Sequence, residues 1–283
     1  MTMQEFNGRV AVVTGAASGM GFAFASRFAA EGMKVVLADI HQASLDAAVA
    51  RITATGATAV GQQTDVSSMA SVEALAERAY AEFGAVHVLC NNAGVVGPKG
   101  KTWEQSLEAW QWLLGVNVWG VIHGIKAFVP RMLAGGEEGH VVNTASMAGV
   151  VTGGMGTSSY DASKHAVVSI TESLFRELAV DEAKISASVL CPGAINTPIY
   201  ENSEREQPKD RSGEHERSFV GDLSRVPDVF PPERVAGEVF DAIKDGRFYI
   251  FAAQPEMGGW MKMRHDRMLE GKNPAVPRRS LGR

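Results

Sequence analysis

Cysteine is scarce in this chain of 283 residues, which contains only two. Cys90 ends the apolar run VHVLC, and Cys191 ends the apolar run ISASVLC. Both positions are typical of strand ends in a protein core, so neither cysteine is expected to be catalytic. We expect buried free thiols in a reducing compartment rather than a disulfide framework.

A strong charge excess and long apolar runs are also absent. The chain has 27 basic and 32 acidic side chains, a net charge of −5, which does not indicate nucleic acid or an acidic membrane as the main partner. The opening residues MTMQEFNGR contain no apolar signal region, and no uncharged apolar run reaches the roughly 18 residues of a membrane helix. The seven histidines lack metal-ligand spacing, so no metal site is predicted. We expect a soluble, cytoplasmic protein.

What the sequence does contain is a regular alternation of apolar runs and helix-period segments. Continuous apolar strands that alternate with helices indicate a parallel sheet covered on both faces. We predict an α/β, doubly wound parallel sheet of about seven strands in a single domain over 1–253. The predicted strands span 9–15, 34–40, 58–66, 87–94, 139–146, 185–193 and 247–253. The predicted helices span 19–32, 42–56, 69–84, about 103–133 with a bend near Gly115–Asn117, 158–181 and 231–246.

Two segments depart from this alternation. Residues 201–218 contain no aliphatic or aromatic side chain, so we expect a mobile surface excursion there, within a substrate-side segment at about 197–230. Residues 254–283 form a C-terminal extension, whose last part from 260 has seven basic and two acidic side chains, 7 − 2 = +5. A solvated tail with one short helix is the simpler interpretation. The alternative is an arm that packs on a neighbouring subunit.

The glycine-rich stretch TGAASGMG, residues 14–21, joins the first predicted strand to the first helix. Gly15 permits a tight turn, while Gly19 and Gly21 let the backbone approach a phosphate at the helix N-terminus. Asp39 ends the next strand, where a carboxylate binds ribose hydroxyls and repels a 2′-phosphate. No Lys or Arg lies within the stretch or directly after Asp39. These features favour NAD over NADP. A plain strand-end turn residue is the alternative for Asp39.

The stretch SSYDASKHAVVSI, residues 158–170, places Tyr160 and Lys164 one helical turn apart on one face. A phenol and an ammonium held side by side indicate an acid/base pair. An ordinary helix with one tyrosine in the core and one lysine in water is the alternative. The spacing alone does not exclude that alternative, so the choice depends on the motifs in the rest of the chain.

Seven motifs occur in order along residues 8–253: TGAASGMG, DV at 65–66, NNAG at 91–94, GVNVWG around Asn117, Ser146, YDASK, and PGAINT at 192–197. In this order they resemble the short-chain dehydrogenase/reductase family, in its short single-domain branch. The spacing TGxxxGxG differs from that of the longer epimerase branch. The resemblance implies a Rossmann-like fold, a nicotinamide cofactor, a small-molecule alcohol or ketone as substrate, and a homodimer or homotetramer.

The resemblance also implies which residues form the site. The catalytic tetrad would be Asn117, Ser146, Tyr160 and Lys164. The cofactor would contact Gly15, Ser18, Met20, Gly21, Asp39, Asp65, Val66, Asn92, Ala93, Gly94, Tyr160, Lys164, Pro192, Gly193, Ile195 and Thr197. The substrate would contact Ser146, Met147, Met155, Tyr160 and Ile199. Ser146 and Tyr160 lie one residue farther apart than is usual in the family, so Thr144 is the alternative hydroxyl.

The chemistry expected of this site begins with the pKa of Tyr160. Free tyrosine has a pKa of about 10, and the Lys164 ammonium together with an oxidised nicotinamide ring should lower it. Tyr160 would then exchange a proton with the substrate oxygen while hydride moves to or from the cofactor. The apolar pocket residues indicate a hydrophobic or aromatic secondary alcohol, or its ketone. The end of the chain also resembles a subgroup that includes lignin-dimer Cα-dehydrogenases.

Several alternatives stay open at this point. Steroids, terpenoid alcohols and 3-oxoacyl thioesters are further candidate substrates, the last with an NADP-linked reductase. A different class of protein is also compatible with the cofactor motif alone, namely a non-catalytic oligomer that binds NAD.

Overall fold

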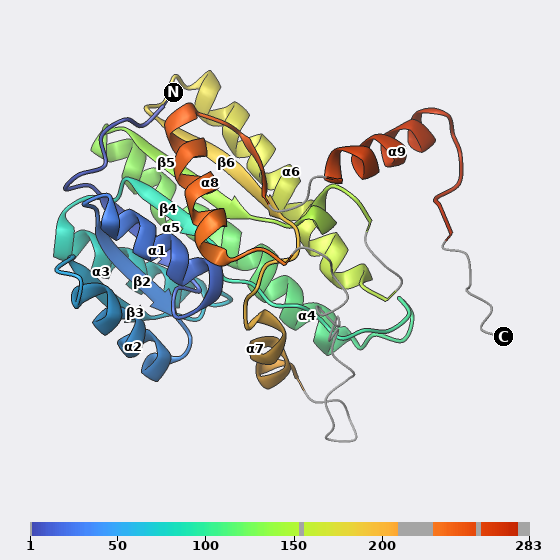
Figure 1. The fold of residues 1–283 in the computed structure, drawn as a ribbon, viewed down its shortest axis with the longest axis horizontal. Coiled ribbons are helices and arrows are strands. Elements are labelled where there is room, and N and C mark those ends of the chain that lie inside the picture. The colour runs from blue at the N-terminus through green and yellow to red at the C-terminus, as the bar shows by residue number, and fades with distance from the viewer. Residues whose placement is uncertain (1, 153–155, 209–228, 253–255, 277–283) are drawn as a thin grey trace.

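The computed structural model contains one seven-stranded sheet in which every neighbouring pair of strands is parallel, with helices on both faces (Figure 1). The strand order is β3-β2-β1-β4-β5-β6-β7. The structure describes residues 2–152, 156–208, 229–252 and 256–276. The predicted fold class and the predicted number of strands are therefore confirmed.

The elements lie close to their predicted positions. The strands are β1 (Val10–Thr14), β2 (Lys34–Asp39), β3 (Ala59–Gln63), β4 (Val88–Asn91), β5 (Gly139–Thr144), β6 (Ile185–Pro192) and β7 (Tyr249–Ala252). The helices are α1 (Gly19–Ala30), α2 (Gln42–Thr53), α3 (Met69–Phe83), α4 (Leu107–Leu114), α5 (Gly120–Gly135), α6 (Ser158–Val180), α7 (Ile199–Glu206), α8 (Pro232–Asp245) and α9 (Met257–Leu269).

The strands are apolar throughout because both faces of the sheet are covered. In β1, Ala11 and Val13 belong to one core cluster together with side chains of α1, α2 and α8. Val10 and Val12 belong to the opposite cluster, with side chains of α3, α5 and α6. Each fully buried valine contributes roughly 1.5–3 kcal/mol. This two-sided burial explains why the strands read as continuous rather than alternating apolar runs.

The strand order reverses at β1, which has β2 on one side and β4 on the other. In open α/β sheets, ligands bind outside the carboxyl ends of the strands at such a switch point. The loops that follow β1, β2, β4 and β5 all leave from this edge because the strands are parallel. The fold therefore brings together the predicted motifs that follow those four strands.

The long helix predicted at 103–133 is a continuous helical stretch from Leu107 to Gly135. The irregularity expected near Gly115–Asn117 is a π-helical segment, η1 (Gly115–Trp119), which separates α4 from α5. By length and apolar composition alone this stretch could cross a membrane. It packs along the sheet instead, with Phe128 and Met132 in the core, and this packing accounts for its apolar character.

Helix α7 corrects one expectation. Residues 201–206 were expected to be part of a mobile surface excursion, but they form most of α7. The side chains of Ser203 and Gln207 are buried, so tertiary contacts hold a segment that contains no apolar residue from 201 onward. The rest of the expected excursion, residues 209–228, lies outside the described residues.

The C-terminal extension contains the one short helix expected, although α9 begins at Met257 rather than near 260. In Figure 1, α9 projects away from the sheet. Only its first residue is buried, and Arg264 donates a hydrogen bond to the Val150 carbonyl oxygen at 3.1 Å. Residues 277–283 lie outside the described residues. Both interpretations of the extension, a solvated tail and an arm on a neighbouring subunit, stay predictions.

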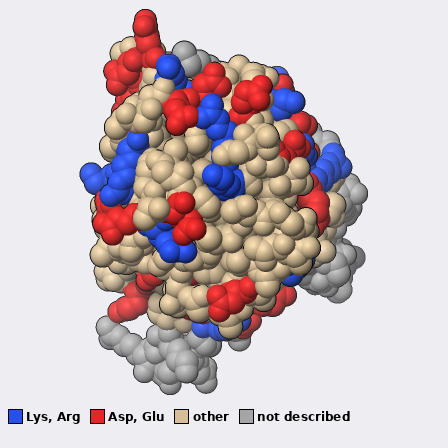
Figure 2. All heavy atoms as spheres, turned by 90° about the vertical axis from the view of Figure 1, so that its left-hand side faces the viewer, with Lys and Arg blue, Asp and Glu red and all other residues tan. Residues whose placement is uncertain are grey.

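Figure 2 shows one face of the molecule, in which acidic and basic side chains are interspersed. Surface ion pairs of the protein include Arg27–Glu31 and Arg131–Glu73. Such pairs contribute little stability, typically about 0–1 kcal/mol each. The mixture on this face differs from the basic stripe typical of a nucleic-acid-binding surface.

Candidate active site

The connection between β1 and α1 leaves no room for a side chain at two of its glycines, Gly15 in the turn and Gly21 in the first turn of α1. Gly15 has φ +64°, and an added Cβ would lie 2.9 Å from the Cα atom of Ala93. A Cβ at Gly21 would lie 2.1 Å from the Gly15 carbonyl oxygen. Helix α1 has no acidic residue in its first turn, and the side chain of its N-cap Ser18 makes no capping hydrogen bond. The open N–H groups suit a pyrophosphate, so this turn fits the predicted dinucleotide.

The strand-end carboxylate is held in a fixed position. Asp39 Oδ2 accepts a hydrogen bond from the Ala17 backbone N–H at 3.1 Å, and Oδ1 accepts one from the His41 N–H at 3.1 Å. These bonds anchor the carboxylate between the glycine-rich turn and the start of α2. Its free lone pairs are directed by the backbone, as a receptor for ribose hydroxyls requires.

A first cavity of about 360 Å³ runs along the carboxyl ends of β1, β2 and β4. Its walls include eleven of the predicted cofactor residues: Gly15, Ser18, Met20, Gly21, Asp39, Asp65, Val66, Asn92, Ala93, Gly94 and Thr197. The hydroxyl of Thr14 fixes the β4 loop to the β1 turn, because it accepts hydrogen bonds from the N–H groups of Asn92 at 2.9 Å and Ala93 at 3.0 Å.

A second cavity of about 310 Å³ adjoins the first. Eight further predicted residues line it: Ser146, Met147, Tyr160, Lys164, Pro192, Gly193, Ile195 and Ile199. Five residues belong to the walls of both cavities: Met20, Asn92, Gly94, Thr197 and Ile199. One ligand in the first cavity can therefore reach a second ligand in the other. Met155, a predicted substrate contact, lies outside the described residues.

The two hydroxyl candidates at the carboxyl end of β5, Thr144 and Ser146, hydrogen-bond different partners. The Ser146 side chain hydrogen-bonds Tyr160 and also accepts the Ala148 N–H at 3.1 Å. The Thr144 hydroxyl instead donates to Asn92 Oδ1 at 3.5 Å, at the limit of hydrogen-bond length. The geometry therefore pairs Ser146 with Tyr160. Ser146 also caps the short helix η2 (Met147–Gly149).

Lys164 is a buried lysine, 4% exposed, at the back of the second cavity. Its Nζ donates to the Thr144 carbonyl oxygen at 3.0 Å and lies 5.7 Å from the centroid of the Tyr160 ring. Burial lowers the pKa of Lys164 to about 8, while the neighbouring Cys191 acts in the opposite direction. The predicted proximity of phenol and ammonium is therefore present in the structure.

The lowering of the Tyr160 pKa was expected with an oxidised cofactor bound, and the chain's own groups act in the opposite direction. Burial raises the pKa of Tyr160 to about 12, the hydrogen bond from Ser146 lowers it, and Tyr200 and Asp161 raise it further. The side chain keeps partial solvent exposure because it opens on the cavity. The protein's own groups thus favour the neutral phenol, because loss of water around the ring outweighs the hydrogen bond from Ser146.

Asn117 lies behind the cavities, in the π-helical segment, and is 1% exposed. Its side chain accepts the Val95 N–H at 2.9 Å and donates to the Val95 carbonyl at 3.0 Å and to Ser163 Oγ at 3.1 Å. A Cβ on Gly94 would touch both Asn117 Oδ1 and Lys164 Nζ at 3.3 Å. Asn117 therefore joins the β4 loop to α6 directly beside Lys164.

Sequence reasoning missed several wall residues. Trp112 and Val116 from the α4–η1 region line the first cavity, and Asp161 lines the second. Helix α7 contributes two more missed wall residues to the first cavity, Asn202 and Glu206. Together with the predicted Ile199 they lie on one helical face, because they are spaced by three and four residues.

Comparison with known proteins places the chain in a family. The family model described as short chain dehydrogenase matches residues 9–208. A 1-deoxy-11-beta-hydroxypentalenate dehydrogenase of Streptomyces avermitilis is 37% identical over 94% of this chain and 96% of its own length. A CLA biosynthesis dehydrogenase/reductase of Lactiplantibacillus plantarum is 32% identical over 97% of this chain and 98% of its own length.

Among solved structures, a short chain dehydrogenase/reductase of Burkholderia phymatum in complex with NAD is 41% identical to this chain, with a TM-score of 0.88. The match covers 97% of this chain and 99% of that one. A nicotinamide cofactor and a small-molecule substrate follow at this level of resemblance. From its fold, its two adjoining cavities and these matches, this chain belongs to the short-chain dehydrogenase/reductase family of oxidoreductases.

Proposed function

We propose that this chain interconverts a secondary alcohol and its ketone by hydride transfer, with NAD(H) as the cofactor and Tyr160 as the acid/base. The observation that carries the proposal is the hydrogen-bonded pair Ser146 and Tyr160, with Lys164 one turn away, in the wall of the second cavity. A nicotinamide dinucleotide bound in the first cavity would supply the hydride acceptor and, in its oxidised form, a positive charge.

The chain's own residues would manage the proton. Ser146 would donate a hydrogen bond to the substrate oxygen and stabilise the negative charge that develops there. Tyr160 Oη would accept the proton of the alcohol, or return it to a ketone in the reverse direction. Asn117 would act as a positioning residue, because its hydrogen bonds hold the loop at Val95 against α6 beside Lys164.

The protonation states of Tyr160 and Lys164 bear on which direction of the reaction the site favours. With a pKa of about 12, Tyr160 is almost fully protonated in the protein without cofactor, which suits a proton donor. Lys164, with a pKa of about 8, is mostly charged at neutral pH. The hydrogen bond from Ser146 does not offset the burial of the phenol. Base catalysis would therefore require the additional positive charge of the oxidised cofactor.

The preference for NAD over NADP rests on Asp39. Its carboxylate lies in the wall of the first cavity and is anchored by two backbone N–H groups. A 2′-phosphate carries a charge of roughly −1.5 to −2, so a fixed carboxylate disfavours it. The relative from Burkholderia phymatum was solved with NAD, which supports the same choice.

The substrate is proposed to be hydrophobic or aromatic. Apolar side chains of the second cavity include Val96, Met147, Ile195 and Ile199. The Streptomyces avermitilis relative is named for dehydrogenation of a hydroxylated compound, which supports an alcohol as the reduced substrate. A bulky cyclic or benzylic alcohol would bury its apolar surface against these side chains.

The test is a screen with NAD(H), followed through the absorbance of the reduced cofactor. The panel contains cyclic and benzylic secondary alcohols, their ketones, and 3-oxoacyl thioesters. Tyr160→Phe should remove turnover of any substrate found while leaving NADH affinity nearly unchanged, as measured by calorimetry. Retained turnover would refute the acid/base role. NADH binding with no turnover across the panel would favour a non-catalytic dinucleotide-binding protein.

Two further parts of the proposal concern the whole protein, which we propose to be a cytoplasmic homodimer or homotetramer. Exposed aromatic side chains support the assembly: Tyr249 and Phe251 stack at 5.8 Å on the edge strand β7, each 42% exposed. Trp119 is 54% exposed. Light scattering after size-exclusion chromatography would test the assembly, and a monomer at micromolar concentration would contradict it.

A further inference from the structure

Helix α7 borders both cavities. Ile199, Asn202 and Glu206 lie on one helical face and line the first cavity, while Ile199 and Tyr200 line the second. The helix is fixed at its centre, because the Val96 N–H donates to the Ser203 hydroxyl at 2.9 Å. The segment just before the helix is close to α1, since a Cβ on Gly19 would lie 3.0 Å from the Thr197 side chain.

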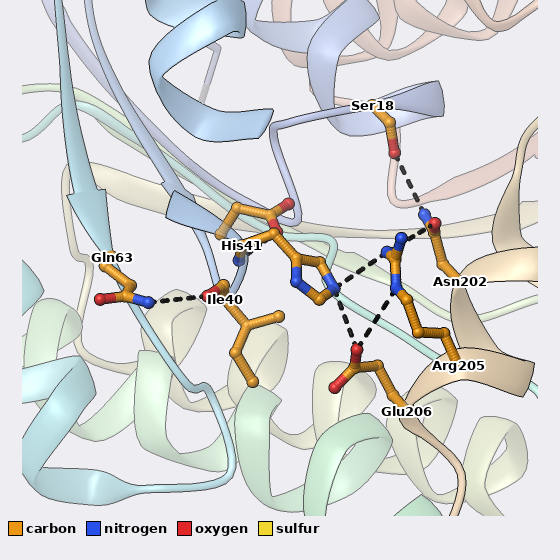
Figure 3. Close-up of polar contacts among 8 residues, drawn as sticks. Ser18, Ile40, His41, Gln63, Asn202, Arg205 and Glu206 are labelled. Carbon is orange, nitrogen blue, oxygen red and sulfur yellow. Dashed lines mark hydrogen bonds and ion pairs between the residues drawn. The ribbon is translucent and has the colours of Figure 1, made fainter. Parts of the chain in front are cut away.

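The last turn of α7 contacts the residues that follow β2, more than 160 positions earlier in the chain (Figure 3). The His41 Nε2 atom lies 3.0 Å from Arg205 and 3.2 Å from Glu206 Oε1. Arg205 also donates to Asn202 Oδ1 at 3.1 Å, and Asn202 donates to the Ser18 hydroxyl at 3.4 Å. The side-chain contacts of α7 thus extend from Ser18 in the glycine-rich turn to His41, two residues after Asp39.

This contact brings a second carboxylate, that of Glu206, to His41, whose backbone N–H is bound by Asp39. Asp39, His41 and Glu206 are all wall residues of the first cavity. The one nearby cation among these contacts, Arg205, is directed to Glu206, with its Nε atom 3.5 Å from Glu206 Oε1. Glu206 therefore adds negative charge beside Asp39 and also neutralises the guanidinium that a 2′-phosphate would otherwise attract.

We infer that Glu206 is a second determinant of cofactor choice, which acts with Asp39 to exclude a 2′-phosphate by its own charge and by its hold on Arg205. The inference rests on the proposed use of a nicotinamide dinucleotide in the first cavity. It differs from the role of Asp39, because the discriminating group comes from the helix that also lines the substrate cavity. Cofactor choice and substrate cavity are thereby linked through one helix of eight residues.

The test compares equilibrium dissociation constants for NADH and NADPH, measured by calorimetry on the full chain without substrate. Glu206→Gln keeps the shape of the side chain, removes one negative charge and removes the ion pair with Arg205. It should tighten NADPH relative to NADH by roughly tenfold, because two like charges no longer face each other in a partly dry site. Arg205→Gln should move the ratio in the opposite direction, and it carries the test if Glu206→Gln does not fold.

The matched control is Glu204→Gln, which makes the same charge change on an exposed position of the same helix. It should leave the NADPH to NADH ratio unchanged. An unchanged ratio in Glu206→Gln, or equal shifts in Glu206→Gln and Glu204→Gln, would overturn the inference. Failure of the wild-type chain to bind either dinucleotide would instead refute the proposed function. The two failures are therefore distinguishable.

Discussion

The buried ammonium of Lys164 should make the protein less stable at neutral pH than at alkaline pH. Burial lowers its pKa from the ordinary 10.5 to about 8. At about pH 7, a shift of that size corresponds to roughly 3 kcal/mol of lost stability, since one pKa unit equals about 1.4 kcal/mol. The side chain is 4% exposed, so solvent screening reduces this estimate little.

The sign of the effect follows from proton counting. Between about pH 8 and about pH 10.5, the unfolded chain holds the Lys164 proton and the folded chain has released it. The unfolded state then binds more protons, so through this group the free energy of unfolding rises with pH across that window. The destabilisation present below about pH 8 is lost above it.

The perturbation that isolates this group is Lys164→Met. Urea unfolding of the variant and of wild type at fixed protein concentration gives the difference in free energy of unfolding at each pH. That difference, variant minus wild type, should fall by roughly 2.5 kcal/mol between about pH 7 and about pH 10. Loss of the hydrogen bond to the Thr144 carbonyl shifts the difference by a constant and leaves its slope intact.

Lys126→Met serves as the control, because it removes an exposed ammonium from α5. An exposed ammonium gives up little hydration on folding, so its difference from wild type should vary much less with pH. If the Lys164→Met difference stayed constant within about 0.5 kcal/mol over the same range, the ammonium would not be desolvated. The charge balance proposed for Tyr160 would then fail as well.

The remaining predictions concern the turn, the core and the hydroxyl pair. Gly21→Ala should abolish NADH binding in calorimetric titration, because its Cβ would lie 2.1 Å from a backbone carbonyl oxygen; retained affinity would contradict this reading of the turn. Asn143→Ala should lower the free energy of unfolding by about 2–4 kcal/mol, because it breaks a buried side-chain chain that links β4, β5 and α6; a urea midpoint equal to that of wild type would exclude the effect. Ser146→Ala should lower kcat about 100-fold with NADH affinity kept, whereas Thr144→Val should change kcat much less; the reverse order would assign the hydroxyl role to Thr144.

Much of the fold was predictable because burial on both faces leaves a strong trace in the sequence. β1 and β2 are short apolar segments bounded by glycine or an acid, and β1 joins α1 through a turn whose glycines are required by close backbone contacts. The site residues that follow strands were predictable for the same reason. In a parallel sheet, all carboxyl ends lie at one edge. Motifs that directly follow the strands in the sequence are therefore brought together at that edge.

The parts that were missed depend on contacts between distant segments. Nothing in the letters ENSERE indicates a helix bound to the domain, since its one buried side chain, Ser203, is held by the backbone of Val96. The cation near Asp39 was missed because Arg205 arrives from α7 rather than from the neighbouring sequence. The burial that raises the pKa of Tyr160 in the chain itself was missed, because the spacing of two residues on a helix gives their distance and not their hydration.

The five residues common to both cavity walls bear on how this enzyme could be altered. A substitution at Met20 or Ile199 changes the lining of both chambers at once, so a gain in substrate range there would be coupled to cofactor affinity. Val96 and Met147 line the second chamber and are absent from the residues that line the first. Directed evolution toward larger alcohols should therefore begin at these two positions, where mutational effects on the two ligands can be separated.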